Sequence, residues 1–222
     1  KLWKNIMKHE LENRILSSIF LVPFSLFFII KGSYFLNIFI LICLIISFYE
    51  WYLMSKNKFY NIPGYLFLLI SFSTLYILRN DNDFGLTTIM LILIICVSTD
   101  IGGYIFGQIF KGPKLIKISP NKTYSGMFGS FFLSIIFICI FLGYYNIHII
   151  ASAEIISFQD FMFVIIISLI SQIGDIFVSF FKRKSKIKNT GKLIPGHGGI
   201  LDRIDGMIFA FPSAYLILNI IN

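Results

Sequence analysis

Long apolar runs separated by short polar loops dominate the pattern of this chain. Seven runs come close to the length of about 20 residues that a helix needs to cross a bilayer. The third is short and is compatible with a tilted or re-entrant segment. We therefore predict an all-α, polytopic membrane protein with about seven transmembrane helices. The predicted spans are 15–30, 34–54, 64–78, 86–106, 126–144, 161–181 and 204–221.

Composition supports lipid as the solvent of most side chains. Hydrophobic residues make up 57% of the 222 positions and charged residues 14%, a balance that a soluble domain cannot bury. The loops are short, so we predict a single integral membrane domain over residues 1–222. The charged first fourteen residues do not suit a signal peptide; they fit a short interfacial helix or an ordinary tail. Residue 1 is Lys, so we expect the natural start to lie upstream.

The placement of basic residues predicts an orientation. With seven spans, 17 of the 19 Lys and Arg residues fall on the side of the N-terminus and of the second, fourth and sixth loops, and 2 on the other side. The positive-inside rule then places the N-terminus and these loops in the cytoplasm. One span more or fewer would break this alternation.

Three carboxylates lie late in spans that run toward the same side: Glu50, Asp100 and Asp175. An ionisable group at membrane depth costs several kcal/mol unless it is paired or hydrated, so each is a functional candidate. Asp175 has the most polar surroundings, because Ser171, Gln172 and Ser179 share its helical face. A polar seam between helices is the alternative for this face. Glu50 precedes an aromatic pair and is interpreted as structural.

The loop from Ser179 to Asp205 concentrates the polar chemistry of the chain. It carries seven basic residues, a glycine-rich turn that includes His197, Gly198 and Gly199, and Asp202 and Asp205 at the start of the last span. If helical, the two aspartates share a face, and with Asp175 they offer the oxygen ligands that Mg²⁺ prefers. Glycines let backbone amides approach a phosphate, which a helix N-terminus also favours.

Each of these features also has a simpler explanation. Acids at the start of a helix complement its dipole, and a basic run serves topology and attracts anionic lipid. A structural turn explains His197 as well as a role in phosphate binding or proton transfer does. The fourth loop adds a second cluster, including Ser119, Lys122 and Thr123. Two basic loops and three carboxylates on one side favour a site for a nucleoside triphosphate and a lipid phosphate.

These residues resemble the signature of the phosphatidate cytidylyltransferases, the CDP-diacylglycerol synthases. The matching pattern in the sixth loop is Ser179-x-x-Lys182-Arg183, Lys188, Gly191, Leu193 to Gly199 and Asp202-Arg203-x-Asp205. Earlier matches are Asp100, Tyr104, Gly107, Ser119-Pro120-x-Lys122-Thr123, Gly126 and Ser171-Gln172-x-Gly174-Asp175. The resemblance makes 100–205 the catalytic region, 1–99 a weakly matching set of helices and 206–222 the last helix.

The resemblance implies an enzyme that converts CTP and phosphatidate to CDP-diacylglycerol and pyrophosphate at the cytoplasmic face of the cell membrane. It implies Mg²⁺, alone or with a second cation, and in-line attack of the lipid phosphate on the α-phosphorus of CTP. The implied metal ligands are Asp175, Asp202 and Asp205, with Lys182 and Arg183 also catalytic. The implied substrate-binding residues are Asp100, Ser119, Lys122, Thr123, Lys188, His197, Gly198, Gly199 and Arg203.

The chain departs from the family pattern at three acids, with Asn189, Ser125 and Val178 in their places. These departures keep a non-catalytic relative that binds anionic lipid or nucleotide as an alternative, beside a CTP-dependent polyprenol kinase. Expected partners are CTP, phosphatidate and membrane lipids, with no nucleic acid; a homodimer is compatible with the sequence.

Overall fold

The computed structural model describes residues 17, 19–80, 84–116, 119–145, 157–191, 193–194 and 198–221. Backbone contacts divide the chain into two compact units. The first unit combines residues 1–79 with 181–204, and the second combines 80–180 with 205–222. Each unit is described by itself below. The single membrane domain expected from the sequence stays a prediction.

The described residues are largely helical, and five helices are long and apolar enough to cross a membrane. A shorter apolar helix covers Ile19–Lys31. The third predicted span, expected to be short, is a full helix of 20 residues. The presence of membrane helices is thus confirmed, while the number of seven spans stays a prediction. The long helices are α2 (Ser33–Ser55), α3 (Asn61–Asn80), α4 (Gly85–Phe110), α5 (Tyr124–Tyr145) and α6 (Phe158–Lys184).

Many large apolar side chains on these helices face outward, which suits a lipid environment. Tyr34 on α2 is 81% exposed and Ile220 near the C-terminus is 82% exposed. A soluble protein rarely exposes apolar surface on this scale. The predicted interfacial helix at the N-terminus lies outside the described residues, so the structure does not bear on it.

In the first unit, polar contacts fix the turn between α2 and α3. Trp51 donates its indole N–H to the carbonyl of Asn61 at 3.0 Å, and Ser55 donates to the Asn61 side chain at 2.9 Å. Ser185, just after α6, donates to the carbonyl of Met54 at 2.6 Å. The last turn of α2, which carries Glu50, is thereby tied to both the next helix and the start of the basic loop.

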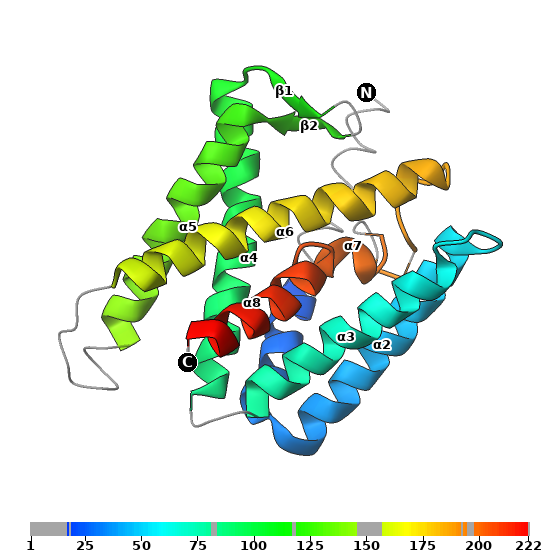
Figure 1. Cartoon of the computed structure of the whole chain (residues 1–222), viewed down its shortest axis with the longest axis horizontal. Coiled ribbons are helices and arrows are strands. Elements are labelled where there is room, and N and C mark those ends of the chain that lie inside the picture. The colour runs from blue at the N-terminus through cyan, green and yellow to red at the C-terminus, as the bar shows by residue number, and fades with distance from the viewer. Residues whose placement is uncertain are drawn as a thin grey trace. The chain divides into compact units, whose positions relative to one another are not determined.

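In the second unit, α4 and α5 pack closely along each other (Figure 1). A Cβ atom added at Gly102 would lie 2.6 Å from the carbonyl oxygen of Gly129, so small residues let the two backbones approach. Hydroxyls join helices as well: Ser130 on α5 donates to the carbonyl of Thr99 on α4 at 2.7 Å, and the hydroxyls of Thr99 and Ser168 on α6 lie 2.7 Å apart. Close packing at small residues and hydrogen bonds from hydroxyls are both common between membrane helices.

Two short strands, β1 (Lys114–Ile116) and β2 (Ser119–Thr123), form an antiparallel pair between α4 and α5. The all-α prediction did not include this hairpin. The small sheet gives Ser119, Lys122 and Thr123 a defined backbone, where the sequence indicated a loop.

The prediction for the last span, 204–221, is wrong about where its helix begins. The short helix α7 (Leu201–Ile204) ends before Asp205, and α8 (Met207–Ile221) begins after Gly206. The sequence suggested that Asp202 and Asp205 share one helical face. The structure instead separates them, because no continuous helix contains both residues. The Asp205 carboxylate accepts a hydrogen bond from the N–H of Gly206 at 3.0 Å, and such local side-chain bonds compete with the helical pattern.

Candidate functional site

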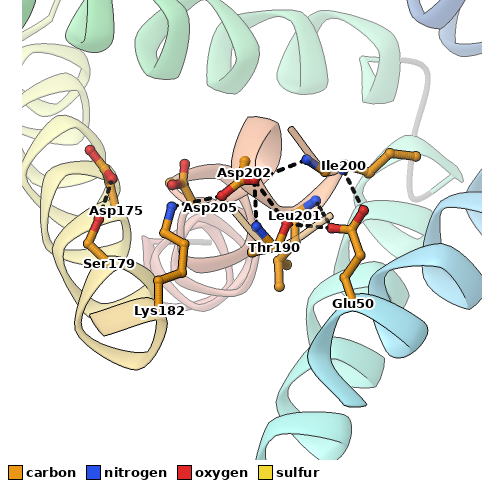
Figure 2. Close-up of polar contacts among 11 residues, drawn as sticks. Glu50, Asp175, Ser179, Lys182, Thr190, Ile200, Leu201, Asp202 and Asp205 are labelled. Carbon is orange, nitrogen blue, oxygen red and sulfur yellow. Dashed lines mark hydrogen bonds and ion pairs between the residues drawn. The ribbon is translucent and has the colours of Figure 1, made fainter. Parts of the chain in front are cut away.

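Glu50 lies at one end of a buried polar network in the first unit (Figure 2). It is 2% exposed. Its carboxylate accepts hydrogen bonds from the Thr190 hydroxyl at 2.7 Å, from the N–H of Ile200 at 2.9 Å and from the N–H of Leu201 at 2.8 Å. Both oxygens accept, which is how a buried carboxylate is satisfied. The sequence interpretation of Glu50 as structural agrees with these contacts.

Asp202 is held as firmly as Glu50, by a different set of donors. Its Oδ1 accepts from Lys182 at 2.8 Å. Its Oδ2 accepts from the N–H of Thr190 at 2.8 Å, the N–H of Gly199 at 3.0 Å and the Thr190 hydroxyl at 3.1 Å. Burial alone raises the pKa of Asp202, but the hydrogen bonds from Lys182, Gly199 and Thr190 outweigh it and hold the pKa below its ordinary value.

The amides around the glycine-rich turn donate to acceptors within the chain. Gly198 donates to the carbonyl of Ile194 at 3.1 Å, and Gly199 donates to Asp202. Ile200 and Leu201 donate to Glu50. These amides were expected to bind a phosphate, but in the structure they already donate to acceptors of the protein. Substrate contact by Gly198 and Gly199 stays a prediction.

Gly198 needs to be glycine for a geometric reason. Its φ is +91°, and a Cβ atom there would lie 2.6 Å from Oδ2 of Asp202. It would also lie 3.1 Å from the Cβ of Asn189. The absence of a side chain at Gly198 thus lets the turn close over Asp202.

The second unit carries its own lysine–aspartate pair. Lys122 on β2 lies 2.5 Å from Oδ2 of Asp175 on α6, and its ammonium also donates to the carbonyl of Gln172 at 3.3 Å. Ser179 donates to Oδ1 of Asp175 at 3.4 Å, one turn along the predicted polar face. The two charged side chains are 25% and 28% exposed. Cations and carboxylates at a partly hydrated position can exchange partners when a charged ligand arrives.

Thr123 caps α5 rather than lying free in a loop. Its hydroxyl accepts from the N–H of Gly126 at 3.1 Å and lies 3.0 Å from the Ser125 hydroxyl. Threonine at an N-cap satisfies an amide that the helix leaves unpaired. Ser125, where the family pattern has an acid, donates in turn to the carbonyl of Lys111. Ser119 lies in β2 and is partly exposed.

Asp205 and Asp175 belong to the same unit. The carbonyl of Asp205 would lie 3.0 Å from a Cβ atom at Gly174, so the backbone of Asp205 passes close to α6 one residue before Asp175. Asp202 belongs to the other unit. Among the described residues, no three His, Cys, Asp or Glu side chains are grouped to hold a metal ion. The metal role of the three aspartates stays a prediction.

For the remaining predicted residues, the structure gives an exposure but no functional role. Four of them are exposed, namely Asp100, Arg183, Lys188 and Arg203. His197 lies outside the described residues. Of the departures from the family pattern, Val178 is 3% exposed and Asn189 is exposed. An apolar side chain suits the buried position 178, and an acid there would need a partner.

Sequence reasoning missed Thr190. It is 2% exposed, and its single hydroxyl lies within hydrogen-bond distance of both Glu50 and Asp202. The available signal was an uncharged hydroxyl between charged and glycine residues in the signature. Its partner Glu50 lies 140 positions earlier, so the pattern alone could not join the two.

A family model described as the cytidylyltransferase family matches residues 65–221. That match covers α4 to α8, the hairpin, both lysine–aspartate pairs and most of α3. It leaves out Glu50.

Curated relatives carry one name. A protein of Brucella suis named phosphatidate cytidylyltransferase is 36% identical over 143 residues, which are 61% of this chain and 48% of that protein. One of Rickettsia typhi with the same name is 43% identical over 129 residues, 56% of this chain and 55% of that protein. One of Staphylococcus epidermidis is 36% identical over 135 residues, 60% and 50% of the two chains. The chain spans about half the length of the curated relatives it matches.

Proposed function

We propose, because the chain belongs to the cytidylyltransferase family, that it transfers a cytidylyl group from CTP to phosphatidate. The products are CDP-diacylglycerol and pyrophosphate. Relatives that are 36% and 43% identical to it over the aligned residues carry the name of this activity. Helices that are apolar enough to cross a membrane also suit a lipid substrate, which is part of the bilayer.

The transfer needs no protein nucleophile. A phosphate oxygen of phosphatidate forms a bond to the α-phosphorus of CTP, and the bond from that phosphorus to the bridging oxygen breaks. The electron pair of the broken bond leaves with pyrophosphate. Charge builds on the phosphate oxygens during this step, so cations fixed near them contribute most of the rate.

The observation that carries the proposal is the presence of two lysine–aspartate pairs in the matched region, Lys182–Asp202 and Lys122–Asp175. Each lysine supplies a positive charge that a phosphate can take over from the carboxylate. Arg183, Lys188 and Arg203 are exposed and are proposed to bind the pyrophosphate part. Asp100, Ser119, Thr123, His197 and the turn glycines are proposed to shape the nucleotide and lipid-phosphate positions.

The residues present also fit a magnesium ion. Carboxylate oxygens are the ligands that Mg²⁺ prefers, and Asp175 is partly exposed, with Oδ1 3.4 Å from the Ser179 hydroxyl and Oδ2 paired with Lys122. We propose Asp175 and Asp202 as the leading ligands, with Asp205 close behind. To bind metal, Asp175 must release Lys122 and Asp202 must release Lys182 from Oδ1. When bound, Mg²⁺ would neutralise charge on the transferring and leaving phosphates.

The basic loops are proposed to face the cytoplasm, where CTP is present. This follows from the excess of Lys and Arg on one side of the spans. The orientation can be tested by labelling single cysteines introduced at exposed Lys188 and Lys31 with a membrane-impermeant reagent in sealed vesicles. Labelling of position 188 from outside right-side-out cells would contradict it.

The activity is tested with purified protein in mixed micelles, α-labelled CTP, phosphatidate and Mg²⁺. We expect labelled CDP-diacylglycerol and equimolar pyrophosphate. Product identity excludes the alternatives: CDP and a lipid phosphate from polyprenol indicate a kinase. No product with either lipid at any Mg²⁺ concentration indicates a non-catalytic relative, which the departures at Asn189, Ser125 and Val178 favour.

A further inference from the structure

Glu50 lies outside the stretch that the family model matches, yet it contacts the centre of the signature loop. Its three hydrogen bonds all reach residues between 190 and 201. Its carboxylate accepts hydrogen bonds from the amides at the start of α7, and the second residue of α7 is Asp202 (Figure 2). The position of Asp202 therefore depends on a side chain from α2.

Two signature glycines are shaped to this side chain. A Cβ atom at Gly191 would lie 2.8 Å from Oε1 of Glu50, and one at Gly199 would clash with the Glu50 carboxylate as well. Both glycines thus allow the loop backbone to close around a buried acid. Their requirement for glycine is explained by Glu50 without any contact to a phosphate.

Thr190 connects Glu50 to Asp202. Its hydroxyl oxygen lies 2.7 Å from Glu50 and 3.1 Å from Asp202, and its N–H donates to Asp202 at 2.8 Å. One hydroxyl hydrogen serves two carboxylates, and the shorter distance favours Glu50. Asp202 in turn holds Lys182 at 2.8 Å. A continuous set of hydrogen bonds runs from Glu50 through Thr190 and Asp202 to the Lys182 ammonium.

We propose that Glu50 is a positioning residue for the transfer reaction: it fixes the segment that carries Asp202, and through Thr190 it sets where Asp202 and Lys182 stand. The inference rests on the function proposed above. Glu50 is 2% exposed and its carboxylate is engaged by protein donors, so its loss is expected to act through geometry. Small displacements of a group that orients phosphates cost up to about 100-fold in rate, and loss of supporting partners around a site costs about 10- to 100-fold.

The experiment compares four single variants and one double variant with the wild-type protein in the CTP assay. Glu50→Gln keeps the shape but turns one acceptor into a donor facing N–H groups. Thr190→Val removes the shared hydroxyl, and Thr190→Ser keeps it. Ser47→Ala is the matched control on the same helix, because Ser47 is 0% exposed and its hydroxyl has no hydrogen-bond partner within the described residues.

We expect Glu50→Gln and Thr190→Val to lower kcat by about 10- to 100-fold with KM for CTP within about threefold. Thr190→Ser and Ser47→Ala should stay within about twofold of the wild-type kcat. The double variant of Glu50→Gln and Thr190→Val should lose no more than the worse single variant, because both remove one connection.

Hydrogen exchange gives a readout that does not depend on activity. The peptide containing Ile200 and Leu201 should exchange at least about tenfold faster in Glu50→Gln, since an NH₂ group replaces one of the two oxygens that accept from these amides. Thr190→Val should leave this exchange close to that of the wild type. If the wild-type protein forms no product, the proposed function fails and the catalytic part of this inference with it, while exchange still decides the anchoring of the segment.

Three outcomes overturn the inference. In the first, kcat of both Glu50→Gln and Thr190→Val stays within twofold of the wild type. In the second, only the yield of folded protein falls, and kcat per folded molecule is unchanged. In the third, the Ile200–Leu201 peptide exchanges in Glu50→Gln at the wild-type rate. If Glu50→Gln does not fold, Thr190→Val alone decides.

Discussion

Two lysine–aspartate pairs use the same groups in different surroundings. Asp202 shares its two oxygens among Lys182, Thr190 and Gly199, and its side chain is 5% exposed. Asp175 has Lys122 and a distant Ser179 hydroxyl, and its side chain is 28% exposed. A carboxylate surrounded by backbone donors holds a loop in place, whereas a partly hydrated one can change partners. The surroundings of Lys182–Asp202 favour a fixed loop position, and those of Lys122–Asp175 favour a change of ionic partners.

The largest expected effect breaks the second pair. Asp175→Asn should lower kcat/KM by at least about 10²- to 10³-fold, because it removes a proposed metal ligand and the partner of Lys122. Stability should change by less than about 1 kcal/mol, since a partly exposed ion pair contributes little. The CTP assay and thermal unfolding in detergent measure the two quantities.

The matched control lies on the same helix. Asp160 near the start of α6 exchanges hydrogen bonds with Ser157, 2.7 Å from its hydroxyl and 3.0 Å from its N–H. Asp160→Asn should keep activity within about twofold, because it alters a helix cap away from the proposed site. Full activity of Asp175→Asn would remove Asp175 from the catalytic set.

The next effect separates the pairs by stability. Lys182→Met leaves Asp202 buried without its cation, which we expect to cost about 2–3 kcal/mol of unfolding free energy. Lys122→Met should cost less than about 1 kcal/mol, because Asp175 is accessible to water. SDS-induced unfolding of both variants measures the difference. Equal losses would show that burial does not distinguish the two pairs.

A third prediction concerns the turn over Asp202. Gly198→Ala should destabilise the protein by about 1–2 kcal/mol, because a non-glycine residue at φ +91° is strained and its Cβ would approach Asp202. Gly143→Ala is the matched control, since a Cβ atom there meets nothing within 4 Å and the position is helical. The control should be neutral or stabilising by up to about 1 kcal/mol. A Gly198→Ala protein as stable as the control would contradict the strained turn.

The sequence predicted the helices well because hydropathy is a local property. The span expected at 34–54 is the helix Ser33–Ser55, and that expected at 126–144 is Tyr124–Tyr145. The break at Asp205–Gly206 and the β1–β2 hairpin were missed, since both depend on local hydrogen bonds in polar segments that hydropathy does not resolve. The division into two units likewise depends on contacts between distant segments.

For the site, the sequence identified the acids and lysines but not their partners. Residue type and spacing marked Asp175, Asp202 and Lys182 as candidates. They could not indicate that the amides of Ile200 and Leu201 donate to Glu50, because that contact joins residues 150 and 151 positions apart. Resemblance named the chemistry, and tertiary contacts alone reveal which acid holds the loop.

The smallest expected effect tests whether the loop can be tuned without disturbing its anchor. Asn189 is exposed, and its Cβ lies near the space that a side chain at Gly198 would fill beside Asp202. Asn189→Asp restores the acid of the family pattern and adds a negative charge in the neighbourhood of Asp202, one of the predicted metal ligands. A nearby anion raises the affinity for a divalent cation, so the Mg²⁺ concentration for half-maximal activity should fall by about two- to fivefold. Titration of the CTP assay with Mg²⁺ measures this shift, with Asn57→Asp, outside the matched region, as the charge control. An unchanged or higher Mg²⁺ requirement would mean that position 189 lies too far from the metal to influence it, and that the pair at Asp175 alone sets the metal dependence.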